Sequence, residues 1–174
     1  MIETIGIAIL KSLAAFLFKS YMISQVKINI EGAPSWYMQP VEAQVCVFDH
    51  QSGGLEAIDK AKNYTYPKME NELSYILEAT IQDKYKSLKD PKEKTFVSMF
   101  KNDKDAPVFI RKNMQFLNID YDLDVKTAFV KGCIDKETIL AYQKERIETI
   151  KHELTHKRAD EAFQEMENGD MSLE

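Results

Sequence analysis

The residues with the clearest capacity for chemistry are His152, Glu153 and His156, which form the pattern H-E-x-x-H. On a helix, two histidines four residues apart share one face, where both can bind a single Zn²⁺. Glu153 would then be placed as a general base. The run HELTH (152–156) therefore raises the hypothesis of a zinc metallopeptidase.

A catalytic zinc also needs a third protein ligand, and the sequence supplies none at a suitable place. Peptidases that resemble thermolysin take it from a later helix, roughly twenty or more residues on, but only 18 residues follow His156. Asp160 would lie about 12 Å along the helix axis from His152. Three basic residues flank the motif: Lys151, Lys157 and Arg158. We therefore expect a charged, solvent-exposed helix end, with no catalytic residue, no metal and no cofactor.

The remaining motifs and the composition argue against several other kinds of binding site and catalytic site. Asp120, Asp122 and Asp124 begin like a calcium loop, but Gly at the sixth position and Glu at the twelfth are missing, so we interpret them as a charged hairpin end. The chain has 23 Lys and Arg against 28 Asp and Glu, a net charge of −5, which argues against nucleic acid as a partner. The sequence has no phosphate-binding loop and no nucleophile elbow.

Residues 1–23 form the most apolar stretch of the chain. Lys11 lies in its middle, and a charge at the bilayer centre costs at least ~3 kcal/mol, so a simple transmembrane helix is disfavoured. As a helix, the segment has a narrow polar stripe and a broad apolar face. We expect that face to make contacts through Ile5, Ile9, Leu13, Phe16 and Leu17. The alternatives are an interfacial helix or uncleaved anchor, an atypical signal, a helix buried between subunits, and a terminal helix packed on its own domain.

We predict that residues 1–23 drive self-association or membrane attachment, because a helix that is apolar over most of its circumference recruits another surface in water. Light scattering on the intact chain and on a chain starting at Gly32 checks this. Identical monomeric behaviour of the two would contradict it.

The remaining pattern predicts an α+β fold: a small antiparallel sheet of about three strands with long helices on one face, plus the N-terminal amphipathic helix. We expect strands at 41–49, 115–122 and 126–134, and a short strand or extended linker at 25–31. Helices are expected at 92–101, after Asp135, and at 55–88, where Pro67 makes either one helix with a defect or two helices in line. The predicted organisation is 1–23 helix, 24–40 extended linker or strand, 41–157 domain, and 158–174 acidic tail, with Asn168-Gly169 ending the last helix.

Two pairs of residues within this pattern carry expectations of their own. Trp36 and Tyr37 are large aromatic residues after Pro34, and we interpret them as packing on the core. We also count them among the interaction residues. Trp36→Ala should lower the free energy of unfolding by roughly 3 kcal/mol or more. Cys46 and Cys133 both fall in predicted strands, where a disulfide would be feasible if the strands were adjacent. Because alternation fixes no register between them, we expect two unpaired thiols.

Several short strings resemble the lipoprotein-twenty family of epsilonproteobacterial surface lipoproteins, which is related to the flagellar outer-membrane lipoprotein FlgP. They are GAPSW (32–36), the helix with Ala57, Ala61, Leu73 and Ile81, and AFVKGCID (128–135) followed by a helix. The likeness covers about 32–153. The family's lipid-bearing Cys has no counterpart, since Cys46 and Cys133 lie in strands.

The resemblance implies a non-enzymatic envelope protein at the periphery of the flagellar motor. We expect a structural or assembly protein, periplasmic or membrane-associated, that acts through protein partners and as a homo-oligomer, with a membrane contact through residues 1–23. The alternatives are the zinc metallopeptidase and a cytosolic interaction domain whose first helix binds a partner.

Overall fold

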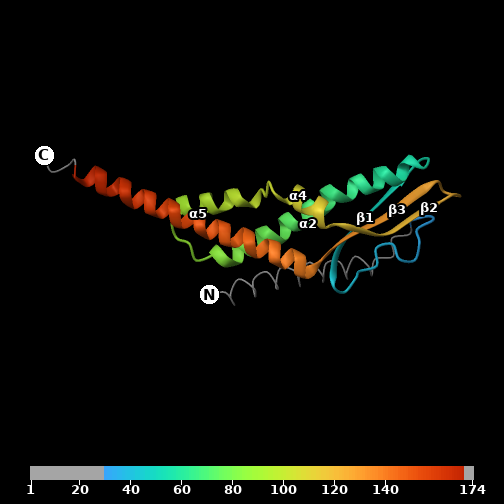
Figure 1. Cartoon of the computed structure of the whole chain (residues 1–174), viewed down its shortest axis with the longest axis horizontal. Coiled ribbons are helices and arrows are strands. Elements are labelled where there is room, and N and C mark those ends of the chain that lie inside the picture. The colour runs from blue at the N-terminus through green and yellow to red at the C-terminus, as the bar shows by residue number, and fades with distance from the viewer. Residues whose placement is uncertain (1–29, 171–174) are drawn as a thin grey trace.

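The computed structural model describes residues 30–170 of the 174-residue chain. The elements, in order, are β1 (Gln44–Ser52), α2 (Glu56–Tyr85), α3 (Pro91–Ser98), the short 3-10 helix η1 (Met99–Lys101), α4 (Ala106–Asn113), β2 (Gln115–Asp122), β3 (Thr127–Asp135) and α5 (Lys136–Asp170). The sheet lies at one end of an elongated molecule, and α5 runs away from it to the other end (Figure 1). The predicted α+β fold is confirmed.

The sheet has three antiparallel strands in the order β1-β3-β2, so β3 is central. Gln44 lies opposite Asp135 and Ser52 opposite Thr127, which pairs β1 with β3 along its whole length. The predicted hairpin of β2 and β3 is confirmed, with a register shift between Phe116 and Asn118. Strand β1 begins and ends three residues later than the predicted strand at 41–49.

Helix α2 covers one face of the sheet. Its buried residues recur mostly at spacings of three and four, from Ala57 to Ile81, which is the pattern of one helix face. Near the start of α2, Ala57 and Ala61 pack with Ala128 and Val130 of β3, where small side chains permit close approach. Pro67 lies inside the helix, which continues through it as a single element.

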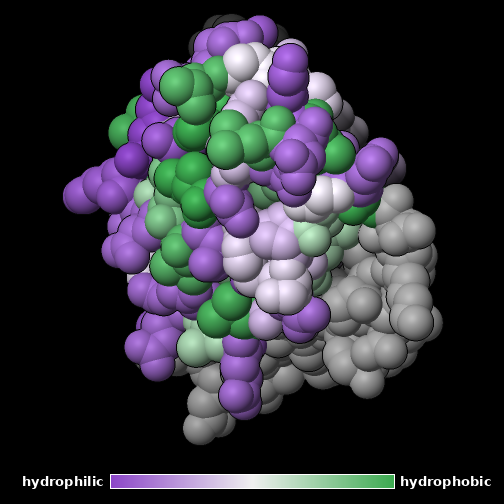
Figure 2. Space-filling model, turned by 90° about the vertical axis from the view of Figure 1, so that its right-hand side faces the viewer, coloured by the Kyte–Doolittle hydropathy of each residue, from purple (hydrophilic) through white to green (hydrophobic). Residues whose placement is uncertain are grey.

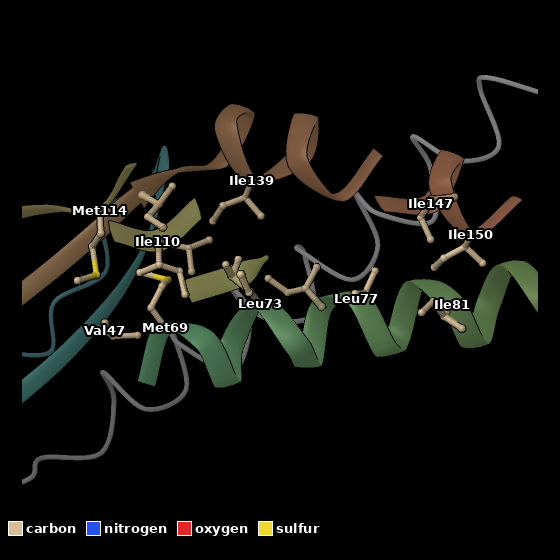
Figure 3. Packing of buried hydrophobic residues seen from close by; sticks show 14 of the residues in the cluster. Val47, Met69, Leu73, Leu77, Ile81, Ile110, Met114, Ile139, Ile147 and Ile150 are labelled. Carbon is tan, nitrogen blue, oxygen red and sulfur yellow. The ribbon is translucent and has the colours of Figure 1, made fainter. Parts of the chain in front are cut away.

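The main core lies between α2, α4, α5 and the sheet. Met69, Leu73 and Leu77 project from α2 toward Val47, Ile110 and Ile139 (Figure 3). Further along, Ile81 meets Ile147 and Ile150 of α5. Burying such aliphatic side chains stabilises the fold by about 1.5–3 kcal/mol each.

Helix α3 matches the predicted helix at 92–101, whereas α4 was not predicted. Asp90 caps α3 by accepting a hydrogen bond from the Lys92 amide at 2.8 Å, and Pro91 occupies its first turn. The stretch 102–107 looked like a loop because it contains Asp and Pro. Pro107 in fact lies in the first turn of α4, where a missing amide proton costs nothing.

Helix α5 continues well past the predicted helix end. It runs to Asp170, so the predicted stop at Asn168-Gly169 and the separate acidic tail from 158 are corrected. Leu154 is the last buried residue among those of α5 whose burial is described. The next turn contacts α3 through Arg158 and Glu93, and the helix then extends past α3 as an arm (Figure 1). Two large apolar side chains, Phe163 and Met166, are exposed on this arm.

The predicted helix at 1–23 lies outside the described residues. Of the predicted strand at 25–31, only Ile30 and Glu31 are described, and neither is in a strand. Within the described residues, no helix combines the length and apolar character needed to cross a membrane.

Candidate functional site

The sheet face opposite α2, called here the outer face, carries Cys46 and Cys133 and is contacted by Trp36 and Tyr37. Strand alternation directs Val45 and Val47 of β1 toward α2 and places Cys46, Phe48 and His50 on the outer face. Their partners on β3 are Cys133, Lys131 and Phe129, in that order. Directly opposed residues point to the same side, so all six side chains share this face.

An aromatic cluster occupies one part of the outer face. It consists of Trp36, Tyr37, Phe48, His50 and Phe129. Tyr37 lies at its centre, with its ring 5.7 Å from Phe48 and 5.1 Å from Phe129, both edge to face. The Tyr37 hydroxyl lies 3.0 Å from His50 Nδ1, and His50 stacks on Phe129. The segment before β1 is thereby attached to the sheet.

Trp36 and Tyr37 therefore contact the sheet, but neither is fully buried. Trp36 meets Tyr37 edge to face at 6.0 Å and remains partly exposed. Tyr37 therefore makes most of the predicted packing contacts with the sheet. The expected loss of unfolding free energy for Trp36→Ala becomes smaller. Of the predicted interaction residues, Ile5, Ile9, Leu13, Phe16 and Leu17 lie outside the described part of the chain.

Lys131 is an unusual member of the outer face because its side chain is buried, with 4% exposure. Its ammonium lies 5.4 Å from the Phe48 ring centre and 5.8 Å from that of Trp36, within cation–π range. Burial lowers the pKa of Lys131 below its ordinary value. Sequence alternation placed Lys131 on the same face as Cys133, but nothing in the pattern indicated burial.

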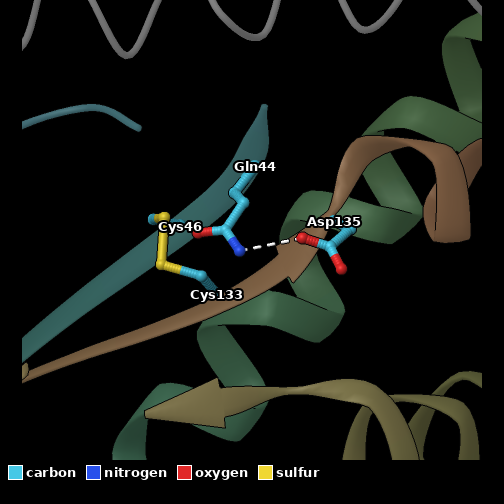
Figure 4. Close-up of a disulfide and its surroundings, with 4 residues drawn as sticks. All are labelled: Gln44, Cys46, Cys133 and Asp135. Atoms are coloured by element: carbon cyan, nitrogen blue, oxygen red, sulfur yellow. Dashed lines mark hydrogen bonds between the residues drawn. A yellow bond between two sulfur atoms is a disulfide. The ribbon is translucent and has the colours of Figure 1, made fainter. Parts of the chain in front are cut away.

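Cys46 and Cys133 form a disulfide, so the prediction of two unpaired thiols is wrong. They are direct partners in the β1–β3 register, with Cα atoms 4.1 Å apart. Gln44 and Asp135 occupy the end of the same strand pair and are joined by a 2.8 Å hydrogen bond from Gln44 Nε2 (Figure 4). The physical reason for the error is the register, which the sequence left open.

The HELTH residues lie on the exposed part of α5. His152 and His156 have their Nε2 atoms 3.3 Å apart, and their ring centres are 4.4 Å apart. Within the described residues, no group of three His, Cys, Asp or Glu side chains could hold a metal ion together. The described part of the chain thus offers two imidazoles and no third protein ligand to a catalytic zinc.

The basic residues that flank HELTH are engaged by carboxylates. Lys151 pairs with Glu148 at 3.3 Å, and Lys157 pairs with Glu161. Arg158 donates two hydrogen bonds to Glu93 on α3, at 2.5 and 2.9 Å. Carboxylates therefore largely neutralise the positive charge beside the motif. The sequence alone did not indicate this pairing.

The two histidines are not needed for folding, so His152→Ala and His156→Ala should each change the free energy of unfolding by less than about 0.5 kcal/mol in metal-free buffer. Both side chains are exposed. Urea denaturation of the two variants beside the unchanged chain tests this. A loss above about 1 kcal/mol for either one would mean that the imidazole contributes to packing.

The acidic hairpin end has a structural role. The Asp122 carboxylate accepts hydrogen bonds from the amides of Asp124 and Val125, at 2.9 and 3.1 Å, which closes the β2–β3 turn. The Asp120 carboxylate accepts from the Tyr121 amide. These contacts use the carboxylates within the turn itself.

A second polar cluster, which sequence reasoning missed, joins α5 to the segment before α4. The Tyr142 hydroxyl donates to the buried carboxylate of Asp103 at 2.7 Å, and Arg146 contacts the same carboxylate at 3.3 Å. Arg146 also pairs with Asp105 at 2.7 Å. Burial is the main cause that raises the pKa of Tyr142, and the bond to Asp103 adds to it. This cluster positions α4 on α5.

Three tyrosines should ionise late, and stability should fall at high pH. Burial is the largest cause that raises the pKa of Tyr37 and Tyr142, and it raises that of Tyr85 to about 12. Tyrosines in the unfolded chain ionise near a pKa of about 10. Their contribution to stability is therefore complete below about pH 10 and is lost as the pH rises further.

Absorbance at alkaline pH should show at least three of the eight tyrosines titrating only after the others. Tyr142→Phe should remove one late step. Simultaneous titration of all eight near pH 10 in the folded protein would contradict the expected burial.

Neither a protein-family model nor a curated protein nor a solved structure matches the chain.

Proposed function

We propose that this chain is a non-enzymatic structural or assembly protein of the bacterial envelope, and an accessory component of the flagellar motor as the family resemblance implies. In this proposal it works in an oxidising compartment, through contacts with protein partners and with further copies of itself. Residues 1–23 supply the attachment to a membrane or to a neighbouring subunit.

The observation that carries the proposal is the Cys46–Cys133 disulfide. Stable disulfides persist in oxidising compartments such as the bacterial periplasm, and thiols in the cytosol are kept reduced. The bond fits the periplasmic side of the envelope better than the alternative of a cytosolic interaction domain.

The exposed apolar side chains support contacts with other proteins. The end of the molecule that carries the β2–β3 hairpin shows hydrophobic patches between hydrophilic ones (Figure 2). On β2 and the following turn the exposed apolar residues are Leu117, Ile119 and Leu123, and on the arm of α5 they are Phe163 and Met166. Contiguous apolar patches on a protein surface mark contact sites, and we expect these residues to supply such contacts.

Two measurements on the full chain test the proposal. The first traps free thiols with an alkylating reagent in cells that export the chain and in cells that retain it. We expect both cysteines to be protected only after export. Protection in both compartments, or reactivity in both, would remove the argument for an oxidising location.

The second measurement compares the full chain with the double variant Leu13→Asp/Phe16→Asp, by light scattering and by flotation with lipid vesicles. Charges on the apolar face of residues 1–23 should abolish self-association or vesicle binding. Lys11→Arg is the matched control, since it keeps the charge pattern. Monomeric, non-floating behaviour of the unchanged chain would refute attachment through this segment.

The zinc metallopeptidase is the competing function from another class. It predicts peptide cleavage that needs Glu153 as the general base. Cleavage by the zinc-supplemented full chain, lost in Glu153→Gln, would favour it over an assembly role.

A further inference from the structure

His152 and His156 are placed to hold a metal ion even though a catalytic third ligand is missing. They lie four residues apart on α5, and their Nε2 atoms are only 3.3 Å from each other. Both side chains are exposed, on the side of the helix away from the buried Leu154. A metal can therefore approach from solvent.

The separation of the two nitrogens fits a tetrahedral ion. Zinc binds imidazole nitrogen at about 2.0–2.1 Å, and at that distance a 3.3 Å separation corresponds to an N–Zn–N angle of roughly 104–111°. The tetrahedral value is about 109°. Ions that prefer right angles, such as Cu²⁺, would need the nitrogens about 2.9 Å apart. The separation of the two nitrogens therefore fits Zn²⁺.

The local charge also favours a cation. Every basic side chain beside the pair is held by a carboxylate, as described above for Lys151, Lys157 and Arg158. Glu153 and Asp160 have no ion-pair partner within the described residues. Together with His156 they line a hollow of about 250 Å³ between α5 and α3. Nearby carboxylates raise the local concentration of a dication and can orient its bound waters.

We propose that His152 and His156 form an exchangeable Zn²⁺ site with two protein ligands, in which water completes the coordination. The site goes beyond the proposed assembly function and does not depend on it. It departs from the sequence-based expectation of no metal. Two ligands hold the ion less firmly than a structural site with four, so the bound ion should exchange readily with free zinc.

The test adds zinc chloride to the metal-free full chain and follows binding by calorimetry and the imidazole protons by NMR. We expect saturable binding of one Zn²⁺ per chain at pH 7.5. The signals of His152 and His156 should shift, and the signal of His50 on β1 should stay in place as the internal reference. At pH 5.5 binding should weaken at least tenfold, because protonated imidazole cannot bind a metal.

Substitutions then assign the ligands. His152→Gln and His156→Gln should each weaken zinc binding at least tenfold, and the double variant should abolish it. Thr155→Ala, which lies between them in the motif, should bind like the unchanged chain.

Three results would overturn the proposal. They are the absence of saturable zinc binding up to millimolar concentration, a shift at His50 in place of the α5 pair, and unchanged affinity in both single variants. The NMR result on the unchanged chain decides the matter even if a variant folds poorly.

Discussion

Loss of the Cys46–Cys133 disulfide is expected to lower the free energy of unfolding by about 4 kcal/mol. The bond joins residues 87 positions apart, and a closed loop of that size strongly restricts the unfolded chain. Denaturation with and without a reductant measures the effect. The double variant Cys46→Ala/Cys133→Ala should show a similar loss.

The double alanine variant is the control for the reductant, which should not change its stability further. A reductant effect below about 1 kcal/mol on the unchanged chain would show that the bond constrains the unfolded state little. It would also weaken the argument that the protein was built for an oxidising compartment.

Phe129→Ala is expected to destabilise the protein by about 4 kcal/mol, within the range for large aromatic residues in cores. Phe129 is fully buried on the central strand and contacts the rings of Tyr37 and His50. The variant removes the surface on which the segment before β1 rests. Urea denaturation gives the loss, and Phe129→Leu should cost about a third as much.

Trp36→Ala provides the comparison from the same aromatic cluster. The sequence predicted a loss of roughly 3 kcal/mol or more, but partial exposure reduces the expectation to about 1–2 kcal/mol. A larger loss of unfolding free energy for Trp36→Ala than for Phe129→Ala would show that Trp36 contributes more to the packing of the segment 30–43 than its exposure indicates.

The sequence predicted the elements best where its periodicity was strong. Alternation in 115–122 and 126–134 located the hairpin to within a residue, because the residue types alternate along both strands and the connecting turn is short. The spacing of apolar residues in 55–88 likewise located α2, although it left open whether Pro67 divides the segment into two helices, which it does not.

Prediction was poorer where tertiary contacts decide the structure. The predicted strand stops at Asp49, before the polar residues His50 and Gln51, yet both pair with β3 as part of β1. The disulfide depends on the register between two strands that are separated by α2, α3, α4 and β2, and no turn sets that register. In α5, the helix-forming residues Ala, Glu, Gln and Met around 159–167 outweigh a late glycine.

In the candidate site, too, local geometry could be predicted from the sequence and tertiary contacts could not. The H-E-x-x-H spacing correctly placed His152 and His156 on one helix face, because helix geometry is local. Pairing of Arg158 with Glu93 could not be predicted, since it joins α5 to a helix 65 residues earlier. Lys131 lies beside the rings of Trp36 and Phe48, which come from two separate segments that only the folded chain brings together.

The position of the disulfide in the chain also determines whether cleavage by a protease separates the protein into two fragments. Helices α2, α3 and α4 and strand β2 all lie between Cys46 and Cys133. A single cut in any of the connections between them leaves both fragments covalently joined through the sheet. The chain before β1 and the α5 arm therefore stay parts of one molecule after such a cut, for as long as the disulfide is not reduced.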